Sequence, residues 1–278
     1  MVLKLNLFLK EAVMFGLAQI IGIYSAANLI ASYRKVDQIP SNFSGFSPID
    51  FLILAGTIIL FIFFSKRGGR AGTIFYKAFL SLALFAGSQI ALQSFTGPSL
   101  SIIISTVLVT AFIIRNNILV HNAIMILAIA GIGAAFGTGI TPPVALSLLT
   151  ALSIYDIVAV YKTKHMIKLA ETMIKSKAIF GFVIPSRLSM VGKKIDDVTP
   201  GDDFMILGSG DIVMPIVLAS SVLSDSIVHS LFISSFSIIG LFLTHILFNS
   251  QKIRQPMAAL PPIAATSIIG YLAAQFFI

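Results

Sequence analysis

The sequence predicts an all-α membrane protein with nine transmembrane helices. Of its 278 residues, 57% are hydrophobic and only 11% are charged, whereas an average soluble domain is about 45–50% apolar and about 25% charged. Two further observations agree with this class: apolar runs are long enough to cross a bilayer, and basic residues gather in alternate loops. A soluble enzyme, a disordered linker and a secreted disulfide scaffold are therefore excluded.

Nine apolar runs lie between charged residues and helix breakers, and a helix that crosses a bilayer needs about 20 residues. The expected spans are residues 12–32, 49–65, 73–93, 100–114, 118–137, 143–161, 204–224, 227–248 and 256–277. The first run follows Lys4 and Lys10, as the apolar part of a signal peptide would. It continues to Ala31, which favours a retained span.

The distribution of charge predicts how these spans are threaded. Seventeen of the 19 Lys and Arg residues lie at the N-terminus or at the second, fourth, sixth and eighth loops, and only Arg34 and Lys35 lie on the other side. Cytoplasmic loops carry the excess of bases. We therefore expect a multi-pass protein of the cell membrane with a cytoplasmic N-terminus and an extracellular C-terminus. The net charge of +8 reports orientation, so no nucleic-acid partner is expected.

One long loop divides the chain. Residues 1–161 are expected to form a six-helix N-terminal membrane part, residues 162–203 a cytoplasmic loop, and residues 204–278 a three-helix C-terminal membrane part. Within the loop, the apolar stretch 178–184 is expected either to form a short strand or to lie on the membrane.

The rarest groups are the carboxylates, of which there are eleven. Nine are assigned to loops or interfaces: Glu11, Asp37, Asp50, Glu171, Asp196, Asp197, Asp202, Asp203 and Asp225. Asp156 and Asp211 remain, and both fall inside predicted spans, where an ionisable side chain is costly and indicates function. At a rise of 1.5 Å per residue, Asp156 lies about 9 Å and Asp211 about 12 Å from the cytoplasmic ends of consecutive antiparallel helices. The two carboxylates are thus expected to face each other.

Two close carboxylates in a medium of low dielectric constant tend to share one proton. In an aspartic peptidase, the ionised acid deprotonates a water molecule while the protonated acid polarises the scissile carbonyl. The same pair would also suit a proton- or cation-coupled membrane transporter, or structural hydrogen bonding. The two acids alone leave these alternatives open.

The neighbouring residues are informative as well. Asp211 follows Gly208, Ser209 and Gly210, and the two glycines permit close approach of backbone, substrate or water. Asp156 follows Tyr155, whose hydroxyl is expected either to hydrogen-bond near the two acids or simply to pack. The ninth span starts with residues 256–262, which include Ala258, Ala259, Leu260, Pro261 and Pro262, and its two adjacent prolines are expected to prevent a regular first turn.

Together these motifs resemble the presenilin and signal peptide peptidase family of intramembrane aspartyl proteases, the GxGD type. The resemblance implies a presenilin-like fold, catalytic Asp156 and Asp211, no metal and no cofactor. It also implies supporting roles for Tyr155, Gly208, Ser209 and Gly210, and substrate binding by Ala258, Ala259, Leu260 and Pro261. The chain departs from the family pattern at Ser209, where an apolar residue is common, and at Ala258, where the family has proline. The small, cysteine-free chain is typical of an archaeal homologue.

The resemblance further implies that a transmembrane helix is the substrate, from a single-span protein or a signal-peptide remnant, in contact with the lipid bilayer. Its backbone must unwind, and the unwound strand is expected to pair with residues 178–184 or with the start of the ninth span. A second copy of the chain, forming a homo-oligomer, is a further expected partner.

Other chemistries fit the residues poorly. The His-Glu-x-x-His pattern of zinc proteases is absent from the sequence, and His229 and His245 on one span are expected to make packing or polar contacts. Gly133 and Gly137 have the small-xxx-small spacing that brings two membrane helices together. We expect that contact rather than a nucleotide site.

Overall fold

The computed structural model describes residues 5–35, 70–115, 117–198, 203–251 and 255–277, and it is almost entirely helical. In chain order the main elements are α1 (Leu5–Lys35), α3 (Arg70–Thr96), α4 (Pro98–Arg115), α5 (Ile118–Thr138), α6 (Pro142–Ile157), the π-helix η1 (Val158–Lys162), α7 (His165–Lys175), β1 (Gly181–Pro185), β2 (Phe204–Gly208), α8 (Ser209–Ser221), α9 (Ile227–Asn249) and α10 (Leu260–Phe277).

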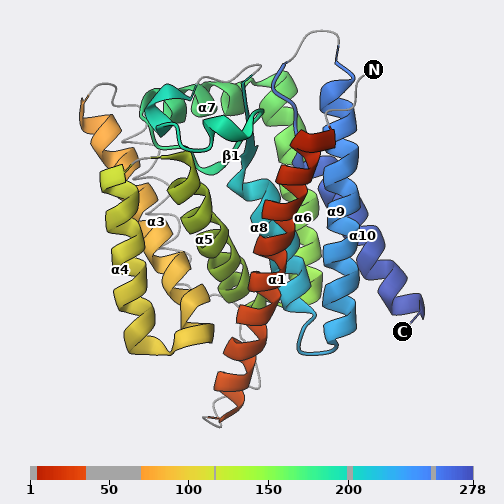
Figure 1. Ribbon diagram of the computed structural model, residues 1–278. Helices are drawn as coiled ribbons and strands as arrows, with labels where there is room; N and C mark the ends of the chain where they lie inside the picture. The colour runs from red at the N-terminus through yellow and green to blue at the C-terminus, as the bar shows by residue number, and fades with distance from the viewer. Residues whose placement is uncertain (1–4, 36–69, 116, 199–202, 252–254, 278) are drawn as a thin grey trace.

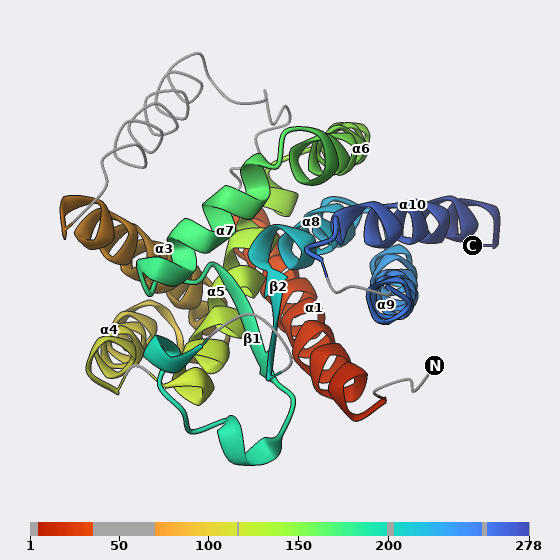
Figure 2. The same ribbon diagram turned by 90° about the horizontal axis from the view of Figure 1, so that it is seen from above.

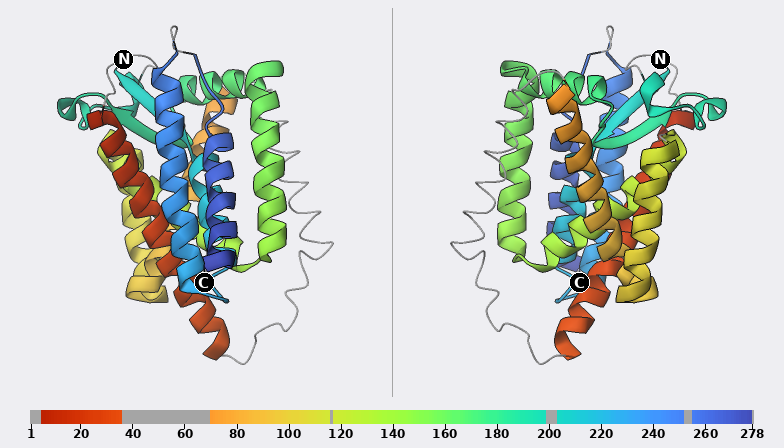
Figure 3. Two further views of the ribbon diagram at one scale, coloured as in Figure 1. Left: turned by 90° about the vertical axis from the view of Figure 1, so that its right-hand side faces the viewer. Right: turned by 90° about the vertical axis from the view of Figure 1, so that its left-hand side faces the viewer.

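The long helices run between two ends of a bundle, and α7 lies across one of these ends (Figure 1). On one side stand α3, α4 and α5; on the other stand α6, α9 and α10, with α1 and α8 between them (Figures 1 and 2). The chain begins at the end that carries α7 and finishes at the opposite end (Figure 3). An odd number of crossings, as the sequence predicts, requires this arrangement.

The structure confirms most of the predicted spans. Within the described residues, six helices are long and apolar enough to cross a membrane, namely α1, α3, α4, α5, α6 with η1, and α9. Two shorter apolar helices, α8 and α10, correspond to the seventh and ninth predicted spans. The second predicted span, residues 49–65, lies outside the described residues.

The seventh predicted span is wrong in its first part. Residues Phe204–Gly208 are not helical but form β2, which pairs antiparallel with β1, placing Gly181 opposite Gly208 and Pro185 opposite Phe204. Helix α8 begins only at Ser209. A short apolar run has the same hydropathy as a strand or a helix, so the pairing with β1 decides its conformation. Of the two alternatives for residues 178–184, the strand is confirmed.

Helix α5 packs against α1, α3, α4 and α8. More than half of its residues are buried, which is typical of a mostly apolar helix surrounded by others. A Cβ added at Gly133 would lie 2.7 Å from Cγ2 of Ile216, and one at Gly137 would lie 2.5 Å from Cβ of Ser220. The small-xxx-small contact is therefore confirmed, and its partner is α8, the helix that carries Asp211.

Candidate active site

Asp211 is the third residue of α8, directly after β2. The backbone of Gly208 hydrogen-bonds to its carboxylate, and a Cβ added at Gly208 would lie 3.0 Å from Oδ2 of Asp211. A side chain at position 208 would therefore require the Asp211 carboxylate to shift. The depth predicted for Asp211 from a helical rise after Asp203 is wrong. Residues 204–208 form a strand, and strand residues advance about 3.3 Å each.

Asp156 is the penultimate residue of α6 and is buried, with 9% of its surface exposed. The helix continues as η1, in which the Thr163 N–H donates to the Val158 carbonyl at 2.9 Å. Such single π-turns are frequent at functional sites because the extra residue changes which side chains share a face. Asp156, Ala159 and Val160 are all buried, because residues i, i+3 and i+4 lie on one face of a helix.

The two carboxylates lie close enough to repel each other electrostatically. This proximity agrees with the prediction that Asp156 and Asp211 lie close together, and their catalytic role stays a prediction. A third segment joins them, since the backbone N–H of Leu260 donates to Oδ2 of Asp156 at 3.4 Å. Residues 255–259 are not helical and α10 begins at Leu260, so Pro261 and Pro262 lie within its first turn. The expectation that these prolines prevent a regular first turn is wrong, because proline is tolerated in the first turn of a helix. Three segments far apart in sequence therefore meet at one point.

The remaining predicted site residues differ in their burial and in their contacts. Ser209 donates its N–H to the Phe180 carbonyl at 3.1 Å and so extends the sheet, while a Cβ on Gly210 would meet nothing within 4 Å. Ala258 is buried beside Leu260, with Ala259 and Pro261 partly buried. Tyr155, next to Asp156 on α6, is 52% exposed.

The hydrogen bonds that flank the sheet show which strand edge is open. Ser209 N–H donates to the Phe180 carbonyl, and Ser186 N–H donates to the Asp203 carbonyl at 2.9 Å. Because hydrogen-bonded pairs alternate along an antiparallel ladder, the even-numbered residues of β1 bond to β2. The backbone groups of Phe204, Ile206 and Gly208 consequently point away from β1. Within the described part of the chain the sheet has only these two strands, so this edge of β2 carries no further strand.

The outer edge of β1 is occupied by side chains that the sequence reasoning missed. Asn122 on α5 donates to the Val183 carbonyl at 2.7 Å and accepts from the Val183 N–H at 2.9 Å. Its neighbour His121 donates through Nε2 to the Gly181 carbonyl at 2.9 Å. From α1, Lys10 donates to the Pro185 carbonyl at 2.9 Å. The sequence contains a signal for these contacts, because adjacent histidine and asparagine residues in an otherwise apolar span are energetically costly unless they find polar partners.

A second buried polar contact was also missed. Glu11, assigned to the interface from sequence, is 2% exposed within α1, and its Oε2 lies 3.0 Å from Nδ1 of His245 on α9. The Phe8 ring packs against the imidazole. The interface assignment is wrong because α1 begins at Leu5 rather than near Ala12, which places Glu11 inside the helix. The expectation that His245 makes a polar contact is confirmed.

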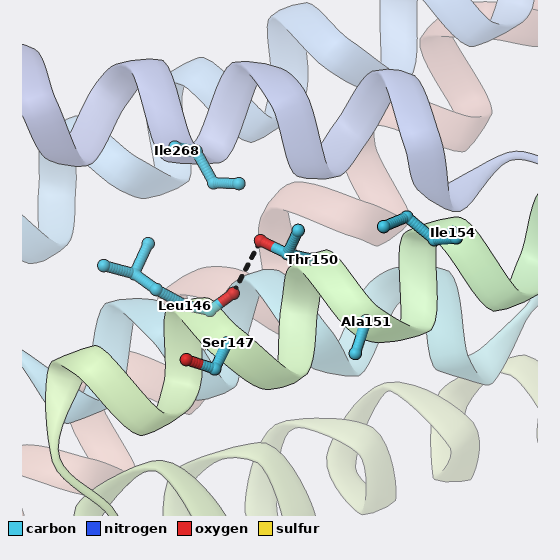
Figure 4. A pocket seen from close by; sticks show the side chains of 6 residues that line it. All are labelled: Leu146, Ser147, Thr150, Ala151, Ile154 and Ile268. Atoms are coloured by element: carbon cyan, nitrogen blue, oxygen red, sulfur yellow. Dashed lines mark hydrogen bonds between the residues drawn. The ribbon is translucent and has the colours of Figure 1, made fainter.

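An open groove of about 480 Å³ separates α6 from α10 (Figure 4). It is lined by Leu146, Ser147, Thr150, Ala151 and Ile154 of α6 and by Ile268 of α10. The hydroxyls of Ser147 and Thr150 donate to carbonyls of their own helix, each at 2.8 Å. With its polar groups satisfied in this way, the groove presents a largely apolar surface.

A helical bundle that crosses the membrane and brings two carboxylates together beside an open strand edge has the features of a protease that works within the bilayer. A sequence profile of the family described as "Signal-peptide peptidase, presenilin aspartyl protease" matches residues 17–278. The chain belongs to this family. It is an intramembrane aspartyl protease, a hydrolase, and the resemblance drawn from its motifs is confirmed. The family gives no support to the transporter alternative.

Solved structures agree with the fold. One, described as a presenilin family intramembrane aspartate protease in space group C222, is 23% identical, covers 95% of each chain and gives a TM-score of 0.61. Another, of such a protease in space group P2, is 22% identical, covers 96% of each chain and gives a TM-score of 0.64. A comparison with curated protein sequences found no match.

Proposed function

We propose that Asp156 and Asp211 are the catalytic pair of this protease and that they activate water against a peptide bond of a transmembrane substrate. The observation that carries the proposal is the placement of Asp156 near the end of α6 and Asp211 near the start of α8, within electrostatic interaction of each other. One ionised carboxylate takes a proton from water as the water oxygen attacks the carbonyl carbon. The other carboxyl, protonated, donates to the carbonyl oxygen. The tetrahedral intermediate then expels the amine, which receives a proton, and leaves a free acid.

We propose further that the substrate is held as a strand on β2. A helical amide is shielded by its own turn, so the substrate backbone must unwind before water can attack. An extended segment gains main-chain hydrogen bonds by adding to an open strand edge. The edge of β2 at Ile206 suits this role because β2 leads directly into α8, whose third residue is Asp211. Pairing with residues 178–184, expected from sequence, is disfavoured because both edges of β1 are already bonded.

The segment before α10 is proposed to bind the other side of the substrate. Ala258, Ala259, Leu260 and Pro261 precede or begin α10, and Leu260 already contacts Asp156. Gly210 leaves open space next to Asp211, where a substrate backbone would pass. Ser209 and Gly208 shape the start of α8, and Tyr155 on the outer face of α6 is proposed to contact the substrate before it unwinds.

The test is cleavage of a generic transmembrane peptide by the purified protein in lipid, with mass spectrometry of the fragments. Asp156→Asn and Asp211→Asn should each reduce turnover by at least about 10²–10⁴-fold, because each removes an acid–base group. Asp225→Asn is the matched control, since Asp225 lies exposed in the turn after α8 and should leave turnover unchanged. Substantial cleavage by either site variant would overturn the assignment.

The orientation of the protein in the membrane is also a proposal. It is supported by the excess of Lys and Arg residues at the end of the bundle that carries α7. We propose that this end, with the N-terminus, faces the cytoplasm, and that the protein is an archaeal cell-membrane enzyme able to self-associate. Because the chain has no cysteine, a single cysteine at Lys164 or at Ser224 can be labelled with a membrane-impermeant thiol reagent. In intact cells, labelling should occur at position 224 and not at position 164; the reverse pattern would invert the topology.

A further inference from the structure

The two strands beside the carboxylates are not connected by a tight turn. Residues 186–203 lie between β1 and β2, whereas hairpins owe their register to a short turn of defined geometry. The register of this sheet must therefore depend on other contacts. Side chains that bind the outer edge of β1 provide them.

Three side chains from two helices contact that edge at alternate residues. His121 and Asn122 of α5 bind the backbone of Gly181 and Val183, and Lys10 of α1 binds that of Pro185. We refer to His121, Asn122 and Lys10 as the edge clamp. Asn122 contributes most, because its carboxamide both donates to and accepts from one residue, as a neighbouring strand would. His121 is completely buried and Asn122 is 9% exposed, so breaking either contact would leave backbone groups without partners away from water.

A close approach fixes the inner edge in the same register. A Cβ added at Gly181 would overlap the Leu207 carbonyl oxygen, so only glycine fits at this place opposite Gly208. The edge clamp and Gly181 thus select one position of β1. Because β2 ends at Gly208, whose backbone bonds to Asp211, the position of β1 is transmitted to the carboxylate and to the open edge.

We propose that Asn122, assisted by His121 and Lys10, is a positioning residue of the proteolytic reaction. By holding the outer edge of β1, it fixes the sheet against the bundle and thereby decides which substrate bond lies at Asp156 and Asp211. The inference rests on the proposed strand addition at β2. Its consequence is that the edge clamp controls the choice of cleavage site, and not only the rate.

The experiment compares Asn122→Ala with wild-type protein on a transmembrane peptide and measures the ratio of products cut at neighbouring bonds. Without the carboxamide, β1 is expected to move, either by a fraction of an ångström or by a full residue of register. A misplacement of about 1 Å is enough to change the rate of catalysis by about 10²-fold. The share of the main product should fall by at least about twofold, with products displaced by one or two residues rising. A change that only lowers the amount of folded enzyme would reduce all products equally.

Asn249→Ala is the matched control, because among the described residues the Asn249 amide donates to the His245 carbonyl of its own helix at 2.9 Å, far from the sheet in sequence. It should keep the wild-type product ratio. Lys10→Met provides a second variant should Asn122→Ala fail to fold, since Lys10 acts on the other end of β1 and is only partly buried. It should change the ratio in the same way.

Hydrogen–deuterium exchange supplies a readout that does not depend on activity. Peptides covering residues 178–185 should exchange faster in Asn122→Ala, because the Val183 N–H loses its acceptor, and so should those covering residues 204–209. Active variants with unchanged product ratios and unchanged exchange would overturn the role of the edge clamp. Failure of the proposed catalytic function would give a different result, namely that the Asp211→Asn variant still cleaves the peptide. The two failures can therefore be distinguished.

Discussion

The backbone N–H of Leu260, the first residue of α10, donates to Oδ2 of Asp156 near the end of α6 at 3.4 Å. The bond joins the ninth predicted span to the sixth across 104 residues of sequence. It exists because the chain before α10 is not helical, which leaves the first N–H groups of the helix without partners inside it. A carboxylate is a favourable acceptor for such a group.

Replacing Leu260 with proline tests this bond. Proline is tolerated at the first position of a helix, where it removes only an N–H that the helix does not use. Because a hydrogen bond to a charged group contributes about 1.5–3 kcal/mol, Leu260→Pro should lower kcat for peptide cleavage by about 10–100-fold. Leu260→Ala is the control, since it loses the buried side chain but keeps the N–H. Equal activities of the two variants would contradict a role for the bond.

The two glycines before Asp211 should differ in their response to alanine. A Cβ at position 208 lies 3.0 Å from the Asp211 carboxylate, whereas one at position 210 meets nothing within 4 Å. We expect Gly208→Ala to displace the carboxylate and to reduce kcat by about tenfold or more, given the sensitivity of catalysis to small displacements. Gly210→Ala should fold without strain. If it raises KM while its thermal unfolding is unchanged, the added methyl group obstructs the substrate.

The close contact between α5 and α8 should be sensitive to a single methyl group. Gly137→Ala places a Cβ 2.5 Å from Ser220, so α8 must move outward; overpacking of this kind costs about 1–3 kcal/mol. The thermal unfolding midpoint in detergent should fall, and activity should fall with it because α8 carries Asp211. Gly16→Ala is the control, since among the described residues its Cβ would approach nothing more closely than Ile238, at 4.0 Å. Equal midpoints for the two variants would contradict the tight contact.

The buried contact between Glu11 and His245 should stabilise α1 against α9. His245→Ala leaves the Glu11 carboxyl group without its partner, and breaking a buried pair costs about 3–5 kcal/mol. His229→Ala on the same helix removes one hydrogen bond to the Ala274 carbonyl and should cost about 1 kcal/mol. Thermal unfolding measures both. The double variant Glu11→Leu with His245→Leu should recover most of the loss, because it removes both polar groups.

Most of the membrane architecture was predictable because hydropathy and charge act locally. The bounds of α5 and α9 match the predicted spans 118–137 and 227–248 within a few residues. Asp156 and Asp211 were also predictable, since carboxylates inside apolar runs are rare and costly. The start of the seventh span was not, because residues 204–208 become a strand only through pairing with β1, and hydropathy does not record a partner.

By itself, the sequence determined that this chain crosses the membrane several times, where its apolar helices lie and which two carboxylates are unusual. These properties depend on the transfer of side chains from water to lipid, which each short segment undergoes on its own. The tertiary structure decided what those carboxylates face: Leu260, the open edge of β2 and, behind it, the edge clamp of His121, Asn122 and Lys10. These contacts join residues 60 or more positions apart, and only the packed bundle brings them within hydrogen-bonding distance. The sequence therefore located the acids, whereas the fold determined the geometry in which they can act.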